Sequence, residues 1–459
     1  MEATAFHLDR ILDLSLPGSG PLAPRLARAR LDRLAATLRL AARESLFYRR
    51  RMGRLLAQGA ERLAGLDQGR AGPGEAEGLM ALVLRELPFT LPADLAAAPE
   101  SFLAVPLDRV EGLTSLPSSG SRGPAKRVFS SAGDLENTLE FFRHGMREVL
   151  GTGETVALMM PGGRPGSVGD LLSRALARRG VPCRVLGFLP GSAGEMPAFL
   201  DALRAARPDC LVGLPSQLMF LARTAPRPEG LRTVLLSGEP APGGLVSALA
   251  GLWRAEVFVH FGMTEFGLGG AVECRARQGP HLREADLLAE IVGPAGQPLS
   301  PGQTGEIVLT SLSREAMPLI RYRTGDLGTL LPGRCPCGSA LRRLVVLGRA
   351  DDRLALADGR PVGLWDVASA LYGLDFVASF SASLLEAQRP LLTLRVGTAE
   401  EGPGQAARAL QAARAVLGPG LDVRITLDPT APPPAAGGAK PSLARTGRGA
   451  ETKGIPASR

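Results

Sequence analysis

The chain has 459 residues, which is enough for two or three domains with sizeable cores, and its 57 Gly and 38 Pro are typical of a loop-rich globular enzyme. The formal net charge is +8, but only 4% of the residues are aromatic and no nucleic-acid-binding motif accompanies the basic residues, so we expect no nucleic-acid partner. We expect no membrane span, because no sufficiently long apolar run appears. The N-terminus does not have the pattern of a signal peptide, and the five cysteines are scattered, which argues against a disulfide-rich secreted domain and predicts a cytoplasmic protein.

The N-terminal part of the chain is expected to be mainly helical. From Pro24 to Leu63, apolar residues recur at helical spacing, which predicts one or two amphipathic helices. The stretch "AGPGEAEG" that begins at Ala71 is predicted to be a loop. The stretch "SSGSRGPAK", from Ser118 to Lys126, has the Gly, Ser and Lys residues of a phosphate-binding loop, although its spacing is not that of a Walker A loop. An ordinary polar surface loop is the alternative.

The rest of the chain divides into three patterns. Between Glu154 and Val272, strand-like runs such as "TVALMM" and "TVLLSG" alternate with helical ones, which predicts a mostly parallel sheet. From Ala289 to Leu331 the pattern is that of a β meander, and after Gly348 it is a smaller α+β pattern. From Asp428 the chain is rich in Pro, Gly and Ala and is expected to be mobile. We therefore predict an α/β fold with a large N-terminal domain of mixed sheets, helices and a β meander (residues 1–348), a small α+β domain (349–430) and a tail (431–459).

Four short motifs follow the Ser118–Lys126 loop along the chain. They are "SGEP" at 237–240, "FGMTE" at 261–265, "RYRTGD" at 321–326 and "GRADD" at 348–352. Taken alone, Asp326 could be a turn residue after Gly325, and Glu265 an acid at a helix N-terminus. However, an Asp can accept hydrogen bonds from two ribose hydroxyls at once, and a Glu can hold Mg²⁺. The order and spacing of the motifs argue against a chance occurrence.

A second group of residues has the composition of a metal site. Cys274 and His281 lie in "ECRARQGPH", and Cys335 and Cys337 lie in "CPCG". Three thiolates and one imidazole can fill a tetrahedral zinc site with no open position. The alternative is buried free thiols with a surface histidine.

These motifs resemble those of the adenylate-forming superfamily, which includes acyl-CoA synthetases, peptide-synthetase adenylation domains and luciferases. The stretches "SLFYRRRM", "LPFTLPADL", "AMPLIRYRTGDLG" and "CPCG" are most similar to its phenylacetate–CoA ligase branch. The resemblance covers Ser45 to Asp352 well and the C-terminal part loosely. It implies an AMP-forming carboxylic acid–CoA ligase, working through an acyl-adenylate, that uses ATP, Mg²⁺, coenzyme A and a small carboxylic acid, as a monomer or homodimer.

The resemblance also implies roles for individual residues. Asp326 would bind the ribose hydroxyls, Arg349 the ribose and phosphate, and Asp351 would be the hinge between the domains. Thr264 would contact the α-phosphate, and Glu265 would hold Mg²⁺. The adenine would lie against Gly238, Glu239 and Pro240, and the β- and γ-phosphates against Ser118, Ser119, Gly120, Ser121, Gly123 and Lys126. The family usually has Thr-Thr where this chain has Ser121-Arg122, and Pro-Lys where it has Pro124-Ala125-Lys126.

The sequence leaves alternatives for the catalytic lysine, for His260 and for the class of protein. The family uses a catalytic lysine near the C-terminus, and both Lys440 in "GGAK" and Lys453 in "ETKG" are candidates; we favour Lys440 because it follows the strand-like run "LDVRITL" at a suitable distance. His260 either lines the acyl pocket or is packed at a strand end. The resemblance implies structural zinc at the Cys/His group. An enzyme with a non-CoA acceptor and a nucleotide-binding regulatory protein without catalysis are the alternatives.

Overall fold

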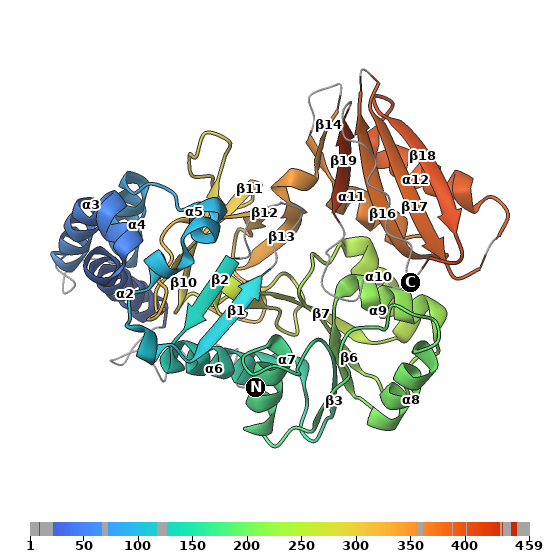
Figure 1. Ribbon diagram of the computed structural model, residues 1–459, viewed down its shortest axis with the longest axis horizontal. Helices are drawn as coiled ribbons and strands as arrows, with labels where there is room; N and C mark the ends of the chain where they lie inside the picture. Colours follow the sequence, from blue (N-terminus) through green and yellow to red (C-terminus); the bar gives the residue numbers. More distant parts are fainter. Residues whose placement is uncertain are drawn as a thin grey trace.

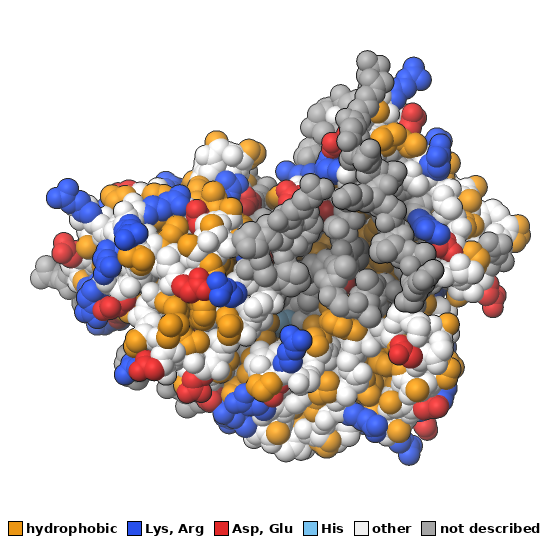
Figure 2. Space-filling model, viewed as in Figure 1, with side chains coloured by type: hydrophobic (Ala, Val, Ile, Leu, Met, Phe, Trp, Pro, Cys, Tyr) orange, Lys and Arg blue, Asp and Glu red, His pale blue; other side chains and the backbone are white. Residues whose placement is uncertain are grey.

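The computed structural model describes residue 9 and residues 22–66, 72–116, 126–356, 361–387, 389–400, 402–431, 434 and 442–447. These residues form a large N-terminal domain and a smaller C-terminal domain built on its own sheet (Figure 1). Among the helices in the described ranges, none combines the length and the apolar character that spanning a membrane requires. On the face shown in Figure 2, Lys and Arg side chains of the described residues are interspersed with acidic and apolar ones.

The N-terminal helices form because their apolar residues recur at helical spacing. Helices α2 (Leu22–Glu44) and α3 (Leu46–Ala64) bury these residues against each other, as the sequence predicts. Helix α4 (Pro73–Glu86) begins inside the stretch that we expected to be a loop, so that prediction was wrong. Pro73 fits the first helical position, and the Glu75 carboxylate accepts a hydrogen bond from the Gly72 N–H at 2.7 Å. The same residues that favour a loop also start a helix.

The central sheet of the large domain has seven strands in the order β4-β3-β5-β6-β7-β8-β9. Its first five strands are parallel, as predicted, and β8 and β9 continue it in antiparallel pairing. The strands are β3 (Val156–Met159), β4 (Cys183–Val185), β5 (Cys210–Gly213), β6 (Thr233–Leu236), β7 (Glu256–Phe261), β8 (Ala271–Val272) and β9 (His281–Leu282).

Helices cover both faces of this sheet, because the buried side chains of each strand point alternately to the two faces. Phe258 of β7 belongs to the apolar cluster that contains Leu139 of α6, whereas its neighbour Val257 belongs to the cluster on the other face, with Leu218 of α9 and Leu245 of α10. The helices between the strands are α6 (Ala132–Val149), α7 (Val168–Ala177), α8 (Met196–Ala206), α9 (Pro215–Thr224) and α10 (Gly243–Trp253).

The predicted β meander is a four-stranded antiparallel sheet of β10 (Leu287–Val292), β11 (Gly305–Ser311), β12 (Tyr322–Leu330) and β13 (Leu344–Arg349). A hairpin of β1 (Gly112–Leu116) and β2 (Lys126–Ser130) lies beside it, and helix α5 (Pro92–Ala97) lies close by (Figure 1). The β12–β13 register places Asp326 opposite Arg349. This sheet therefore brings two of the predicted nucleotide-binding residues together.

The C-terminal domain has a four-stranded sheet in the order β18-β17-β16-β19. Strand β19 pairs in parallel with β16 and lies within residues 431–459, which we expected to form only a tail. The elements are β14 (Arg353–Ala355), β15 (Pro361–Gly363), α11 (Leu364–Tyr372), β16 (Val377–Glu386), β17 (Leu391–Thr398), α12 (Gln405–Leu417), β18 (Asp422–Asp428) and β19 (Leu443–Gly447). Helix α11 packs against α10, and β16 packs against α9, so one apolar core continues from the large domain into the small one.

Candidate active site

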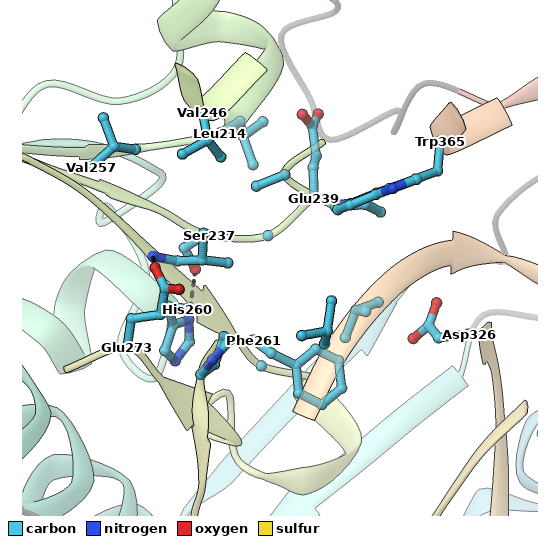
Figure 3. Close-up of a pocket in the computed structure, with 18 of the residues that line it drawn as sticks. Leu214, Ser237, Glu239, Val246, Val257, His260, Phe261, Glu273, Asp326 and Trp365 are labelled. Atoms are coloured by element: carbon cyan, nitrogen blue, oxygen red, sulfur yellow. Dashed lines mark hydrogen bonds between the residues drawn. The ribbon is translucent and has the colours of Figure 1, made fainter. Parts of the chain in front are cut away.

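The candidate site is a cavity of about 2010 Å³ between the two domains (Figure 3). Its lining includes the segments that follow the carboxyl ends of β6 and β7, where open parallel sheets commonly bind ligands, and it extends along these strands to Arg232 and Glu256. Strands β12 and β13 form another side, and the small domain contributes Trp365 and the residues 442–445. Segments far apart in the sequence therefore meet at one place.

Lys126 and Glu265, which line this cavity, form a polar group with the fully buried Tyr322. Lys126 at the start of β2 donates to Glu265 at 3.0 Å and to the hydroxyl of Tyr322 at 3.2 Å, and that hydroxyl donates to Glu265 at 3.1 Å. Burial and the Glu265 charge raise the pKa of Tyr322, so it remains a neutral donor. A cation and a carboxylate thus lie side by side where phosphates and a metal ion are expected. Tyr322 was not predicted as a site residue.

Asp326 and Arg349 form an ion pair across the β12–β13 ladder. Arg349 Nη1 lies 2.9 Å from Asp326 Oδ1 and donates to the Thr324 carbonyl at 2.9 Å. Burial works against the Arg349 charge, but Asp326 outweighs it and the pKa of Arg349 is raised. Gly325 adopts a positive φ of 72°, and a Cβ there would lie 2.8 Å from Arg349 Nη2. The glycine in "RTGD" therefore lets the guanidinium approach the strand.

The "SGEP" segment is held by the N-terminus of α9. The Glu239 carboxylate accepts hydrogen bonds from the Ser216 N–H and hydroxyl, both at 3.0 Å. Gly238 has a φ of 87°, and a Cβ there would lie 2.7 Å from Leu214 Cδ2. Glu239 thus fixes the shape of the segment with its carboxylate, and Trp365 of the small domain lies beside it (Figure 3).

Ser237 and His260 form a hydrogen-bonded pair in the cavity wall, with Ser237 Oγ 2.9 Å from His260 Nδ1 (Figure 3). The His260 ring also packs against the rings of Phe141 and Phe142, with centroids 5.9 and 6.0 Å away. Burial lowers the pKa of His260 to about 4, and its Nε2 has no hydrogen-bond partner among the described residues. His260 is therefore a neutral residue that both packs at the end of β7 and lines the cavity.

The predicted metal ligands form a second, separate cluster. The ligand atoms of Cys274, His281, Cys335 and Cys337 all lie within 4.8 Å of one another. Cys274 Sγ is 3.7 Å from Cys335 Sγ, and Cys337 Sγ is 3.4 Å from His281 Nε2. His281 Nδ1 is 3.2 Å from the Leu341 carbonyl, which can only accept, so Nδ1 carries the proton and Nε2 keeps its lone pair. Burial lowers the pKa of His281 to about 4, which keeps the imidazole neutral.

The remaining predicted residues divide into two sets. Thr264, Pro240 and Asp351 line the same cavity as Lys126 and Asp326. Ser118, Ser119, Gly120, Ser121, Gly123, Lys440 and Lys453 lie outside the described residues. Two further residues were given no role from the sequence: Tyr322 lies within "RYRTGD", and Trp365, which lines the cavity, lies outside every predicted motif.

Comparison with known proteins supports the resemblance that the motifs suggested. Residues 93–313 match the family model described as AMP-binding enzyme. Phenylacetate-coenzyme A ligase of Pseudomonas putida is 31% identical over 285 residues, which cover 60% of this chain and 62% of that protein. The corresponding enzyme of Thermus thermophilus is 31% identical over 292 residues, with the same coverage. The match thus spans less than two thirds of the length of these relatives.

Solved structures show the same fold. A 2-hydroxyisobutyryl-CoA ligase in the postadenylation state has a TM-score of 0.74 at 20% identity, over 91% of this chain and 89% of that one. The same ligase in its thioesterification state has a TM-score of 0.60, over 92% and 89%. Residues 93–313 are therefore similar to the AMP-binding enzyme family, and the chain has the fold of this CoA ligase. The sequence of the chain is phenylacetate–CoA ligase-like, which confirms the expected resemblance.

Proposed function

We propose that this protein is an ATP-dependent, AMP-forming carboxylic acid–CoA ligase. The observation that carries the proposal is that Lys126, Glu265 and Asp326 come from separate segments and line one cavity. In the first half-reaction a carboxylate oxygen bonds to the α-phosphorus of ATP, and the bond to pyrophosphate breaks. In the second, the thiol of coenzyme A bonds to the acyl carbon, and AMP leaves. The acyl-adenylate divides a difficult condensation into two easier steps.

The described residues fit the nucleotide as follows. Asp326 accepts from the ribose hydroxyls, and Arg349, which contacts it, faces the same cavity. Lys126 and Thr264 direct a cation and a hydroxyl toward the phosphates. The Glu265 oxygens suit a hard cation, and Mg²⁺ bound there would neutralise phosphate charge. The loop at 118–123 would complete this site, and the hydrophobic cavity wall with His260 would receive the acid.

Lys440 remains the favoured C-terminal lysine. In the sequence it precedes Leu443, the first residue of β19 and part of the cavity wall, by three residues. Lys453 follows Gly447, the last residue of β19, by six residues in the sequence. Lys440 would contact the carboxylate and α-phosphate during adenylation.

The second step would follow a rotation of the small domain, whose sheet includes β19, about Asp351. The present arrangement supports an assignment to the adenylation half of the cycle, since the TM-score is 0.74 against the postadenylation state of the ligase compared above and 0.60 against its thioesterification state. Trp365, which lines the cavity here, would leave it on rotation.

The Cys/His cluster would hold structural zinc. Ligands about 2.3 Å from a tetrahedral metal ion lie about 3.8 Å apart, and Cys274 Sγ and Cys335 Sγ are 3.7 Å apart. Four protein ligands leave no position for water or substrate, so the ion would stabilise the fold rather than take part in the reaction. It would tie the loop before β9 to the loop between β12 and β13.

A panel of aryl and short-chain carboxylic acids tests the proposal, with pyrophosphate release measured first and CoA thioester measured by mass spectrometry. Release together with thioester is the expected result. Release without thioester from any acid would point to a different acceptor. Binding of ATP without release, across the panel, would favour the regulatory alternative.

A further inference from the structure

The hinge segment is bound to the large domain on one side only. Up to Arg349 the chain belongs to β13, and the Arg349 guanidinium is held by Asp326 and by the Thr324 carbonyl of β12. The short helical turn η4 (Ala350–Asp352) follows directly. The strand pairing and hydrogen bonds that attach β13 to the large domain therefore end at Arg349.

The other side of the hinge is bound to β19. The carboxylate of Asp352, which is only 8% exposed, accepts a hydrogen bond from the Leu443 N–H at 2.9 Å. Arg445 Nη2 donates to the carbonyls of Asp351 at 3.2 Å and Arg353 at 2.6 Å, while its Nη1 pairs with Glu386 of β16 at 2.5 Å. The strand at the end of the described chain is thus attached to the hinge by two separate side chains.

These contacts give β19 a role that its pairing alone does not explain. The strand has five residues, pairs with β16 on one edge, and contributes Leu443 and Arg445 to the cavity wall. A short edge strand with one neighbour frays easily at its ends. Asp352 accepts the hydrogen bond of Leu443, the first residue of the strand, which follows the favoured Lys440 by three residues in the sequence.

On the basis of the function proposed above, we infer that Asp352 and Arg445 are positioning residues that fasten β19 to the small-domain side of the hinge. They keep the start of β19 at the cavity during adenylation, and they carry it away when the hinge turns. The pivot is thereby confined to Ala350 and the amide side of Asp351, between the Arg349–Asp326 contact and the contacts that the Asp351 carbonyl and the Asp352 carboxylate make with β19.

Asp352→Ala tests this role, because it removes the acceptor of the Leu443 N–H. We expect acid-dependent ATP–pyrophosphate exchange to fall at least tenfold at saturating ATP, with the KM for ATP within twofold of the wild-type value. Conversion of supplied acyl-adenylate and CoA to thioester should stay within threefold. Asp352→Asn retains an oxygen acceptor and should restore exchange to within threefold.

Asp366→Ala is the matched control. The Asp366 carboxylate also accepts a hydrogen bond from a backbone N–H of the small domain, that of Gly363 at 3.0 Å, and this bond caps α11 rather than joining β19 to the hinge turn. Both half-reactions should remain unchanged. Equal losses in both half-reactions of Asp352→Ala, or full exchange activity, would overturn the positioning role.

Hydrogen exchange of the peptide 442–447 tests the attachment independently of activity. The amide hydrogens of this peptide should exchange faster in Asp352→Ala and in Arg445→Ala than in the wild type, but not in Asp352→Asn. Unchanged amide hydrogen exchange in both alanine variants would refute the attachment even if the wild-type protein activates no acid. A wild-type protein that forms no adenylate while these exchange differences appear would contradict the proposed ligase and support the attachment.

Discussion

Gly244 and Ser369 join the two domains at a contact that leaves no room for a side chain. The Gly244 N–H donates to Ser369 Oγ at 2.9 Å, and a Cβ at Gly244 would lie 1.9 Å from the Ser369 carbonyl oxygen. The contact lies where α10 meets α11, within the apolar core that continues between the domains. Rotation about Asp351 would have to break it.

Gly244→Ala should therefore shift the domains away from the present arrangement. Overpacking typically costs about 1–3 kcal/mol, which corresponds to roughly a 5- to 150-fold change in the equilibrium between arrangements. We expect slower adenylate formation, with thioester formation from supplied acyl-adenylate retained, and a changed small-angle X-ray scattering profile.

Gly243→Ala controls for the added methyl group, since a Cβ there meets only Ser369 Oγ at 3.9 Å, an ordinary contact. If both alanine variants behave alike, the close approach of Gly244 does not control the domain arrangement.

The sequence predicted the parts of this fold and site that local patterns specify. The alternation of strand-like and helical runs predicted the five parallel strands, because each run shows its own apolar pattern in the sequence. The motifs "RTGD" and "GRADD" pointed to Asp326 and Arg349, which the structure pairs across β12 and β13. The Gly244–Ser369 contact and the place of Trp365 in the cavity depend on segments more than 100 residues apart in the sequence. Tyr322 lies in "RYRTGD", but its contacts with Lys126 and Glu265 depend on separate segments. Strand β19 has too few residues for a period-two pattern to stand out.

Asp326→Ala should weaken ATP binding. Hydrogen bonds to a charged group contribute about 1.5–3 kcal/mol each, so losing those to the ribose should raise the dissociation constant for ATP at least tenfold. Isothermal titration calorimetry with ATP measures this directly. Asp366→Ala serves again as the control, and wild-type ATP affinity in Asp326→Ala would contradict the ribose assignment.

The metal cluster predicts about one zinc ion per chain in protein purified without chelators. Cys335→Ser should lower the metal content and the thermal midpoint, because structural zinc binding is coupled to folding. Cys183→Ser is the matched control, since Cys183 lies in β4, outside the cluster. Elemental analysis that finds no zinc in the wild-type protein would reject the site.

His260 should make the protein less stable in acid. Its pKa is about 4 in the folded state and about 6.5 when unfolded, so the unfolded chain binds more protons between these values and the free energy of unfolding falls as the pH drops from about 6.5 to 4. The slope from one histidine is at most about 1.4 kcal/mol per pH unit. Urea unfolding at pH 7.0, 5.5 and 4.5 should show a smaller decrease in His260→Gln than in the wild type. Equal decreases would mean that His260 is not buried and neutral.

The hinge assignment makes a pair of opposite predictions. Proline fixes φ near −65° and removes an amide donor, so Asp351→Pro should obstruct rotation, keep acid-dependent adenylate formation and lower thioester formation at least tenfold. Lys440→Ala should do the reverse: it should impair adenylation yet convert supplied acyl-adenylate and CoA to thioester. Lys453→Ala is the control for the lysine; if it abolishes adenylation and Lys440→Ala does not, the catalytic lysine is Lys453. We place the hinge at Asp351 because the Arg349–Asp326 and Asp352–Leu443 contacts leave only Ala350 and Asp351 between them. Equal damage to both half-reactions in Asp351→Pro would place the hinge elsewhere.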